Sequence, residues 1–375
     1  MRAEARTFVL VLGLLGSLAS LRAADRWKIQ YLYDQPGSNF DIRDLACPSA
    51  RHCVAAGVIT DNNDRQRGSV VITDDGGLHW SQIEVKEQPL SLFFLDPTTG
   101  WMVTDHGLWS TVEGGRGWNK VETRKGILQA SFLDSAHGYI AGTSSLLDET
   151  HDGGKTWAKV PEAAIASANA RALSFDSITF QGPHGIVIGE VDPSVPAPKS
   201  AKGSASAERQ TASRQMIVLE TLDGGGKWTT SSVSLDAGLG RLRLSKQGSV
   251  LALLVYTQAH STLASAVFQM ALGDPHSRMI FGQPDRAVTD VALLAGAGSV
   301  SDGAVIVAVE PPGKGPRVPI PGKLKILESP NLTLWQEMDV DYRALAQAAV
   351  VSVADNRHIW VATDTGAILG LVEGQ

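Results

Sequence analysis

Short apolar segments recur along the chain, separated by turns rich in glycine and aspartate. Ahead of Trp118 the segments read SLFFLD, GWMVTD and GLWST, and ahead of Trp157 they read QASFLD, GYIAGT and SLLDET. A further segment follows each tryptophan, as in WNKVE and WAKVP. Short β-prone runs joined by tight turns are typical of antiparallel meanders. The pattern therefore predicts units of four antiparallel strands.

In four of the units, a motif of the form Thr-x-(Asp/Glu)-x-Gly-x-x-Trp begins with the last residue of the third segment. It reads TDDGGLHW at 73–80, TVEGGRGW at 111–118, THDGGKTW at 150–157 and TLDGGGKW at 221–228. The first three of its tryptophans are 38 and 39 residues apart. A four-stranded unit that returns about every 40 residues is typical of a β-propeller blade.

In such a blade the motif forms the turn between the third and fourth strands. Its carboxylate can accept hydrogen bonds from backbone amides of the turn, its glycines take positive φ values, and its tryptophan packs between blades. A catalytic motif normally occurs once, so we interpret the repeated residues as structural. They are Thr73, Asp75, Gly77, Trp80, Thr111, Glu113, Gly115, Trp118, Thr150, Asp152, Gly154, Trp157, Thr221, Asp223, Gly225 and Trp228.

The motif resembles a known module. Thr150, Asp152, Gly154, Thr156 and Trp157 match the Asp-box, or BNR, repeat of sialidases and related propellers. The preceding strands, SFLDSAHGYIAGT, resemble in particular the photosystem II stability/assembly factor family and its bacterial relatives. The Asp-box is specific for the fold and uninformative about function, because enzymes and binding proteins share it.

The two ends of the chain are predicted to share one blade. Trp27, in WKIQYLY, begins a segment that resembles a fourth strand, and the tail HIWVATDTGAILGLVEGQ resembles middle strands without a fourth. Joining them closes the ring and removes exposed sheet edges. The other blades are expected to end at Trp80, Trp118, Trp157, Trp228, near Arg278, and at Trp335, where ESPNLTLW keeps part of the motif. We therefore predict an all-β, seven-bladed propeller domain over residues 25–375, with six or eight blades as alternatives.

Residues 1–24 have the order of a secretory signal peptide. Basic residues precede an apolar run from Phe8 to about Ala19, and small residues follow at Ala23 and Ala24. The run is shorter than the roughly 20 residues of a membrane span. We expect cleavage and export to the periplasm or cell exterior, leaving a mature chain without a transmembrane segment; an uncleaved anchor is the alternative.

Two cysteines, Cys47 and Cys53, lie in DLACPSARHCVAAG. In an exported chain an even pair favours a disulfide. Two buried free thiols are the alternative, and no histidine pair lies nearby to complete a zinc site.

Three insertions are expected between the second and third strands of their blades, at 60–68, 192–214 and 311–322. The second is rich in Ala, Ser, Pro and Lys, so we expect a disordered loop; a linker between domains is the alternative. These loops emerge on the face opposite the Asp-boxes, where we expect function.

Five arginines, each just ahead of an innermost strand, are candidates for a partner-binding patch on that face. The guanidinium group suits carboxylates and phosphates, and the resemblance implies a basic patch of this kind. The alternative is that these side chains are only solvated. The candidates are Arg43, Arg171, Arg241, Arg286 and Arg343.

Catalytic signatures are absent from the sequence. It has no Arg-Ile-Pro signature of sialidases, no GxSxG elbow, and no HExxH or other dense histidine spacing. We therefore predict no catalytic residue, cofactor or metal. Calcium binding by Asp148 with Asp152, or Asp74 with Asp75, is disfavoured because the Asp-box turn already uses one carboxylate of each pair.

Lys plus Arg total 33 against 39 Asp plus Glu, which gives no electrostatic footprint for nucleic acid. The leading hypothesis is an exported, monomeric, non-enzymatic propeller that binds another protein, by resemblance an assembly or stability factor for a membrane complex. A sialidase-like or other glycan hydrolase, and a glycan-binding propeller, are the alternatives.

Overall fold

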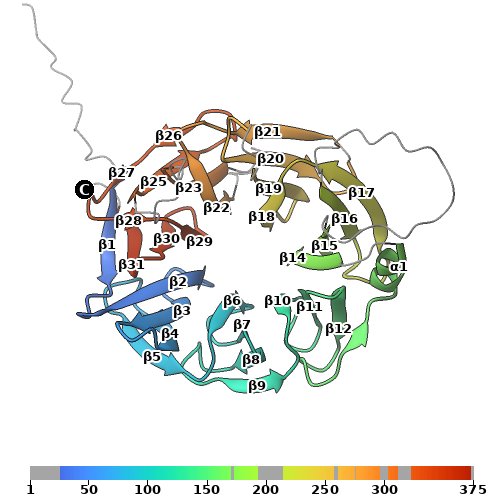
Figure 1. Cartoon of the computed structure of the whole chain (residues 1–375), viewed down its shortest axis with the longest axis horizontal. Helices are drawn as coiled ribbons and strands as arrows, with labels where there is room; N and C mark the ends of the chain where they lie inside the picture. Colours follow the sequence, from blue (N-terminus) through green and yellow to red (C-terminus); the bar gives the residue numbers. More distant parts are fainter. Residues whose placement is uncertain are drawn as a thin grey trace, which may run out of the picture.

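Seven antiparallel sheets are arranged as a ring around a central channel (Figure 1), which confirms the predicted all-β, seven-bladed propeller. The computed structural model describes residues 26–169, 173–192, 214–256, 261–274, 276–295, 303–310 and 322–372. The predicted signal peptide, Arg171, and nearly all of the insertions at 192–214 and 311–322 lie outside the described residues.

The first four blades follow the order expected from the repeat, each with its first strand innermost (Figure 1). They are β2 (Ser38–Ala46), β3 (Cys53–Asp61), β4 (Gln66–Thr73) and β5 (Ser81–Val85); β6 (Pro89–Phe94), β7 (Gly100–Thr104), β8 (Gly107–Thr111) and β9 (Asn119–Glu122); β10 (Ile127–Phe132), β11 (Gly138–Gly142), β12 (Leu146–Thr150) and β13 (Ala158–Lys159); and β14 (Leu173–Gln181), β15 (His184–Val191), β16 (Arg214–Thr221) and β17 (Thr229–Leu235).

The remaining three blades keep this arrangement, with small additions at the outer edge. They are β18 (Gly238–Leu244), β19 (Ser249–Val255), β20 (Ser265–Ala271) and β21 (Ser277–Phe281); β22 (Ala287–Leu294), β23 (Gly303–Val309), β25 (Lys325–Ser329) and β26 (Gln336–Glu337); and β29 (Ala349–Asp355), β30 (His358–Thr363), β31 (Ala367–Val372) and β1 (Arg26–Leu32), the last extended by β27 (Asp339–Val340). A two-stranded ribbon joins β24 (Gly322–Lys323) to β28 (Leu345–Ala346).

The ring closes as predicted, through antiparallel pairing of β1 with β31. Trp27 lies opposite Leu371, and its side chain is completely buried. Because the first described strand is the outer strand of the last blade, the two ends of the chain hold each other in place and no open edge remains at the junction.

Aromatic side chains fill the spaces between neighbouring blades. Trp101 of the second blade stacks on Phe132 of the third at 3.6 Å between ring centroids. Tyr139 of the third blade stacks on Phe180 of the fourth at 4.9 Å. Rings of this kind each bury roughly 150–250 Å², so these stacks bury apolar surface between neighbouring sheets.

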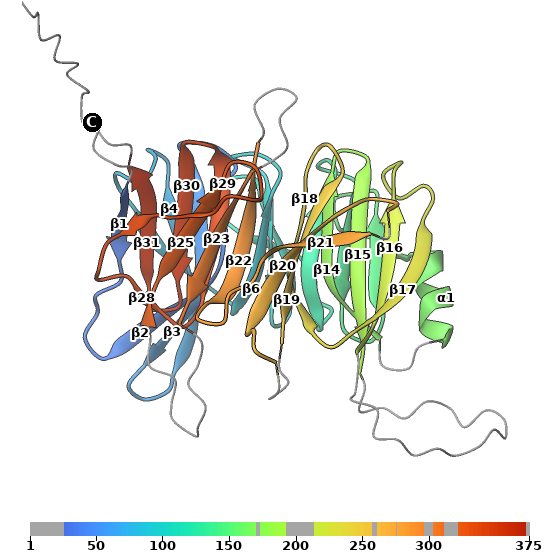
Figure 2. The same cartoon turned by 90° about the horizontal axis from the view of Figure 1, so that it is seen from above.

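Two local features add to the sequence-based expectation. The segment 60–68 joins the second and third strands of its blade, as predicted, but it does so by continuing β3 and β4 into a tight turn. Asp61 closes this turn by accepting hydrogen bonds from the amides of Asn63 and Arg65. A helix, α1 (Pro161–Asn169), packs on the outside of the ring (Figure 2). Its alanine-rich sequence with proline at the first position favours a helix.

Within the part of the chain that the structure describes, no helix has the length and apolarity of a membrane span.

Candidate functional site

A cavity of about 610 Å³ occupies the channel and is lined by residues from all seven innermost strands. We call it the channel cavity. The lining residues come from the C-terminal halves of these strands, as with Ala46 and Cys47 from the end of β2 and Lys246 just beyond β18. The cavity therefore lies toward one end of the channel.

That end carries the Asp-box turns. In each of the first four blades, the first glycine of the motif donates a hydrogen bond to a carbonyl in the turn that follows the innermost strand. The bonds are Gly76 to Arg51, Gly114 to Thr98, Gly153 to Ala136 and Gly224 to Pro183, at 2.7–3.0 Å. From the sequence we expected function on the opposite face, whereas the cavity lies on the Asp-box side.

The Asp-box turns themselves have the geometry of structural elements. In the third blade Thr150 Oγ1 accepts from the amide of Gly154 at 2.9 Å and donates to Asp152 Oδ1 at 2.9 Å. Asp152 in turn accepts from the amide and hydroxyl of Thr156, which hold the pKa of its carboxyl at about 2. Trp157 Nε1 donates to the carbonyl of Gly154 at 3.0 Å. The carboxylate is thus directed into its own turn.

The sixth blade keeps this turn with different residues. In ESPNLTLW, Asn331 Oδ1 takes the place of the aspartate and accepts from the amide and hydroxyl of Thr333. Ser329 Oγ takes the place of the threonine and accepts from the amide of Asn331. Hydrogen-bonding capacity rather than residue identity is what the blade retains.

The predicted disulfide between Cys47 and Cys53 is present and spans the turn between β2 and β3. The same turn forms part of the rim of the channel cavity, because Cys47 and Pro48 line it. The disulfide thus fixes one part of that rim.

Two of the charged side chains that line the channel cavity come from β18, which reads GLGRLRL. Alternation along the strand buries Leu242 and Leu244 between blades and directs Arg241 and Arg243 toward the channel. A β-bulge between Leu239 and Arg241 marks the start of this charged stretch.

Both guanidinium groups bind one buried carboxylate. Arg241 Nε lies 3.1 Å from Asp290 Oδ1, and Arg243 Nη2 lies 3.0 Å from the same oxygen. The Asp290 side chain is 1% exposed and also accepts from the amides of Val291 and Val351. Its attraction raises the pKa of Arg241, whereas burial lowers the pKa of Arg243.

Two further ionisable groups line the channel cavity. Asp44 accepts hydrogen bonds from the amides of Leu45 and Leu92, and burial raises its pKa. Lys246 is exposed and has neither a hydrogen bond nor an ion pair within the described part of the chain. The lysine is therefore a cation available to a ligand.

Polar side chains of the innermost strands bond to the backbone of the next blade around most of the ring. These contacts tie the wall of the channel together and fix where its donors and acceptors point. They are Asp44 Oδ2 with the amide of Leu92, Ser91 Oγ with the carbonyl of Leu128, Gln129 Oε1 with the amide of Ile178, Asp290 Oδ2 with the amide of Val351, and Ser352 Oγ with the amide of Cys47, at 2.8–3.1 Å.

Of the predicted partner-binding arginines that the structure describes, Arg241 alone lines the channel cavity. Arg43 binds Asp41 and the carbonyl of Pro89. Two others are also paired with carboxylates: Arg286 with Asp285 and Glu337, and Arg343 with Asp341.

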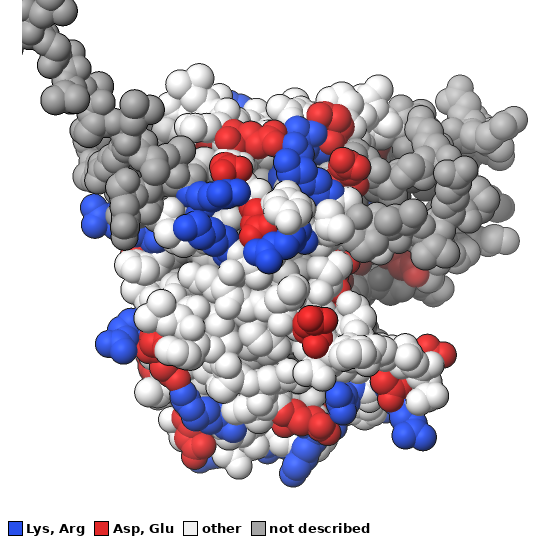
Figure 3. Space-filling view, turned by 90° about the vertical axis from the view of Figure 1, so that its left-hand side faces the viewer, with Lys and Arg blue, Asp and Glu red and all other residues white. Residues whose placement is uncertain are grey.

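Surface charge on the outer side of the last blade is mixed. On the side of the ring that carries β1 and β31, Figure 3 shows Lys and Arg side chains directly beside Asp and Glu. The ion pair of Arg26 with Asp339, at 3.1 Å, belongs to the same region of the fold. Alternating charges of this kind do not make a basic patch.

Arg243 and Lys246 were missed by the sequence analysis. The signal was present as RLRL followed by Lys246, because alternation of arginine with leucine puts both arginines on one face of a strand. Asp290, which organises the pair, comes from a different blade and had no local signal.

The described lining of the channel cavity holds a single carboxylate, Asp44, and no tyrosine. A glycosidase needs two carboxyl groups facing the scissile bond. The cavity does not present that pair, because Asp290 is buried and occupied by the two arginines.

Comparisons with known proteins agree with this architecture. Residues 118–195 match the family model of photosynthesis system II assembly factor YCF48. The fold is similar to YCF48 bound to D1 peptide, at 14% identity and a TM-score of 0.55, covering 92% of this chain and 96% of that one. It is also similar to YCF48 from Cyanidioschyzon merolae, at 14% identity and a TM-score of 0.57, covering 92% and 98%.

The tricorn protease shares the fold too, at 12% identity and a TM-score of 0.53, covering 91% of this chain and 34% of that one. The comparison with curated proteins returned no match. At these identities the structural likeness establishes the fold and leaves activity open. In fold, and in the sequence of residues 118–195, the chain resembles the YCF48 propellers.

Proposed function

We propose that the protein is an exported, non-enzymatic propeller that binds a segment of another protein in its channel cavity and acts as an assembly or stability factor for a membrane complex. The observation that carries this proposal is the cationic lining formed by Arg241, Arg243 and Lys246. The likeness to YCF48 bound to D1 peptide supports a protein partner. The N-terminal sequence supports export.

The charges indicate what kind of segment fits. Three cations, Arg241, Arg243 and Lys246, stand against two carboxylates, Asp44 and Asp290, which is a formal excess of one positive charge. Burial raises the pKa of Asp44 and so weakens its negative charge further. An acidic side chain or a terminal carboxylate is the complementary group, because guanidinium and ammonium groups bind carboxylates by charge-assisted hydrogen bonds.

The size of the cavity limits what enters it. Small-ligand pockets are typically about 300–1,000 Å³, and the channel cavity lies within that range at about 610 Å³. It accommodates a few residues of an extended segment or a chain terminus. Wider contacts with the partner would involve the turns around the rim.

The proposal is tested by recovering partners from solubilised membranes of the source organism with the immobilised mature chain. Lys246→Glu is expected to lower recovery of the main partner at least about fivefold, since it replaces the free cation with a repelling charge. Arg243→Gln is expected to lower it to a smaller extent. Lys28→Glu, on the exposed face of β1, is the matched control and should leave recovery unchanged.

Recovery that is equal in the wild type and Lys246→Glu, or equally reduced in Lys28→Glu, would contradict binding in the channel cavity. Catalytic turnover of a glycan by the purified chain would contradict the non-enzymatic part of the proposal. Fractionation of cells that express the chain with and without residues 1–24 tests export separately.

A further inference from the structure

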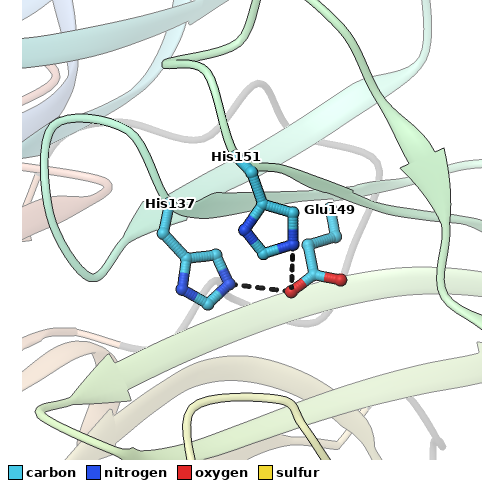
Figure 4. Close-up of side chains that lie close together, drawn as sticks. All are labelled: His137, Glu149 and His151. Atoms are coloured by element: carbon cyan, nitrogen blue, oxygen red, sulfur yellow. Dashed lines mark hydrogen bonds and ion pairs between the residues drawn. The ribbon is translucent and has the colours of Figure 1, made fainter.

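Two histidines and a glutamate meet at the Asp-box end of the third blade (Figure 4). His137 ends the turn between β10 and β11, Glu149 is in β12, and His151 is the second residue of the Asp-box. Pairing of β11 with β12 sets Tyr139 opposite Glu149 and Gly138 opposite Thr150. The same register, continued by one residue, brings His137 opposite His151.

The ligating atoms of these three side chains converge on one point. His137 Nε2 lies 2.7 Å from Glu149 Oε1, and His151 Nε2 lies 3.5 Å from the same oxygen (Figure 4). One ligating atom from each residue lies within 4.8 Å of the other two. The imidazole rings are stacked at 4.6 Å between centroids, so both present nitrogen atoms toward the same carboxylate.

We propose that His137, Glu149 and His151 form a binding site for one divalent transition-metal ion of the Zn²⁺ class. Two imidazoles and one carboxylate are a donor set that suits zinc and its neighbours rather than magnesium or calcium, which prefer oxygen ligands. Three protein ligands leave a fourth position open to water or to a group from a partner. This site is separate from the channel cavity and does not depend on the proposed function.

Only a small movement brings the ligands to bonding distance. Zinc binds histidine nitrogen at about 2.0–2.1 Å and carboxylate oxygen at about 2.0–2.2 Å, so its ligand atoms are roughly 3.3 Å apart. The side chain of His151 is 70% exposed, whereas those of His137 and Glu149 are 23% and 25% exposed. His151 is thus free to rotate onto an ion held by the two less exposed groups.

Tyr139 orients the glutamate. Its hydroxyl lies 2.5 Å from Glu149 Oε1 and 2.9 Å from the carbonyl oxygen of Gly224 in the next blade. A hydrogen-bonded partner behind a metal ligand is a regular feature of metal sites and strengthens binding. The hydroxyl thus bonds the same carboxylate oxygen that faces the histidines, and it lies 3.2 Å from His137 Nε2.

The other Asp-box blades supply an internal comparison. In the first and fourth blades, His52 and His184 occupy the position that corresponds to His137. Each directly precedes the residue of the second strand that pairs with the Asp-box threonine. In the first blade Asp74 is opposite His52 and also binds Arg116, so a cation already occupies that carboxylate.

In the fourth blade Leu222 stands at the place of His151, although Glu220 stands at that of Glu149. The structure describes these positions in all four Asp-box blades, and among them the complete set of three ligands occurs in the third blade.

The test is equilibrium dialysis of the untagged, chelator-treated chain against Zn²⁺, followed by Co²⁺ titration as a spectroscopic probe of nitrogen and oxygen ligands. The wild type is expected to bind about one equivalent of Zn²⁺. His151→Ala and Glu149→Gln should each weaken binding by about tenfold or more, and Tyr139→Phe by about 10–100-fold, as for hydrogen-bonded partners of ligands.

His276→Ala is the matched control and should bind Zn²⁺ like the wild type. This histidine is 89% exposed and has a single carboxylate partner, Asp274, at 2.6 Å. His151→Ala alters an exposed side chain. A midpoint of thermal unfolding that equals that of the wild type without metal will show that the variant folds. The proposal is overturned if the wild type binds no stoichiometric Zn²⁺, or if folded His151→Ala binds it as tightly as the wild type.

Discussion

Replacing Asp290 by asparagine is expected to destabilise the propeller strongly, and more than Asp152→Asn or Asp339→Asn does. The side chain is 1% exposed and accepts hydrogen bonds from Arg241, Arg243 and the amides of Val291 and Val351. These contacts join the fifth, sixth and seventh blades. Asparagine retains one acceptor oxygen but removes the negative charge that pairs directly with two partly buried guanidinium groups.

The expected magnitude follows from burial. Breaking a buried ion pair by removing one partner costs about 3–5 kcal/mol. The side chains of Arg241 and Arg243 are 16% and 29% exposed, so water screens part of the loss and we expect about 3–4 kcal/mol. With an unfolding entropy of about 2.1 cal/mol/K per residue, this corresponds to a Tm lowered by roughly 4–5 °C for a chain of this length.

The assay is thermal unfolding followed by circular dichroism at neutral pH. Asp339→Asn is the control, because Asp339 is 62% exposed and pairs with an exposed arginine; exposed pairs contribute about 0–1 kcal/mol. Adding Arg243→Met to Asp290→Asn should restore part of the stability by removing one uncompensated cation. A difference of about 1 °C in Tm corresponds to the contribution of an exposed ion pair. If the Tm values of Asp290→Asn and Asp339→Asn differ by no more than about this amount, the reasoning is refuted.

The remaining predictions concern the Asp-box turns. The pKa of the Asp152 carboxyl is held at about 2 by the hydroxyl and amide of Thr156, against about 3.9 in an unfolded chain. A lowered folded-state pKa contributes stability that is present above about pH 4 and is lost as the pH falls toward 2. Asp152→Asn should therefore lower the Tm at pH 5, and the difference from the wild type should shrink between pH 4 and pH 2; a difference that stays constant over this range would argue against the assignment. Gly225 has φ of +100°, and a Cβ there would lie 1.8 Å from Tyr139 Oη, whereas Gly248 has φ of +83° and no atom within 4 Å. By denaturant unfolding, Gly248→Ala is expected to cost about 1–2 kcal/mol from backbone strain alone, and Gly225→Ala about 2–4 kcal/mol because overpacking adds to it; equal costs would show that the contact with Tyr139 is unimportant.

The architecture was predictable because the repeated motif specifies it locally. A threonine, an acidic residue and a glycine in one turn satisfy each other's hydrogen-bonding groups. The spacing of this motif predicted the first four blades, and the segments at the two chain ends predicted the closure of the ring. The sixth blade was harder to recognise because Ser329 and Asn331 replace the threonine and aspartate while making equivalent hydrogen bonds. Helix α1 was missed because it is a short alanine-rich segment with no partner in the repeat.

The candidate sites were less predictable, because each depends on residues from different strands. Arg241 was chosen from the sequence, but Arg243 became significant only through Asp290, which lies in the next blade. His137 and His151 are 14 positions apart, a spacing typical of no metal motif, and the register of β11 with β12 is what brings them together. Hydrogen bonds within a turn can be predicted from residues that are adjacent in the sequence. Contacts between blades depend on how the closed ring places distant residues side by side.

The central claim is that a partner polypeptide occupies the channel cavity. Its most direct test places a photo-crosslinking amino acid at position 246 of the full chain in the source organism, with the same substitution at position 28 on β1 as the control. We predict a defined adduct with one subunit of a membrane complex from position 246 and none from position 28. Adducts of equal yield from both positions, or none from position 246 while the partner is still recovered with the protein, would contradict binding in the channel cavity.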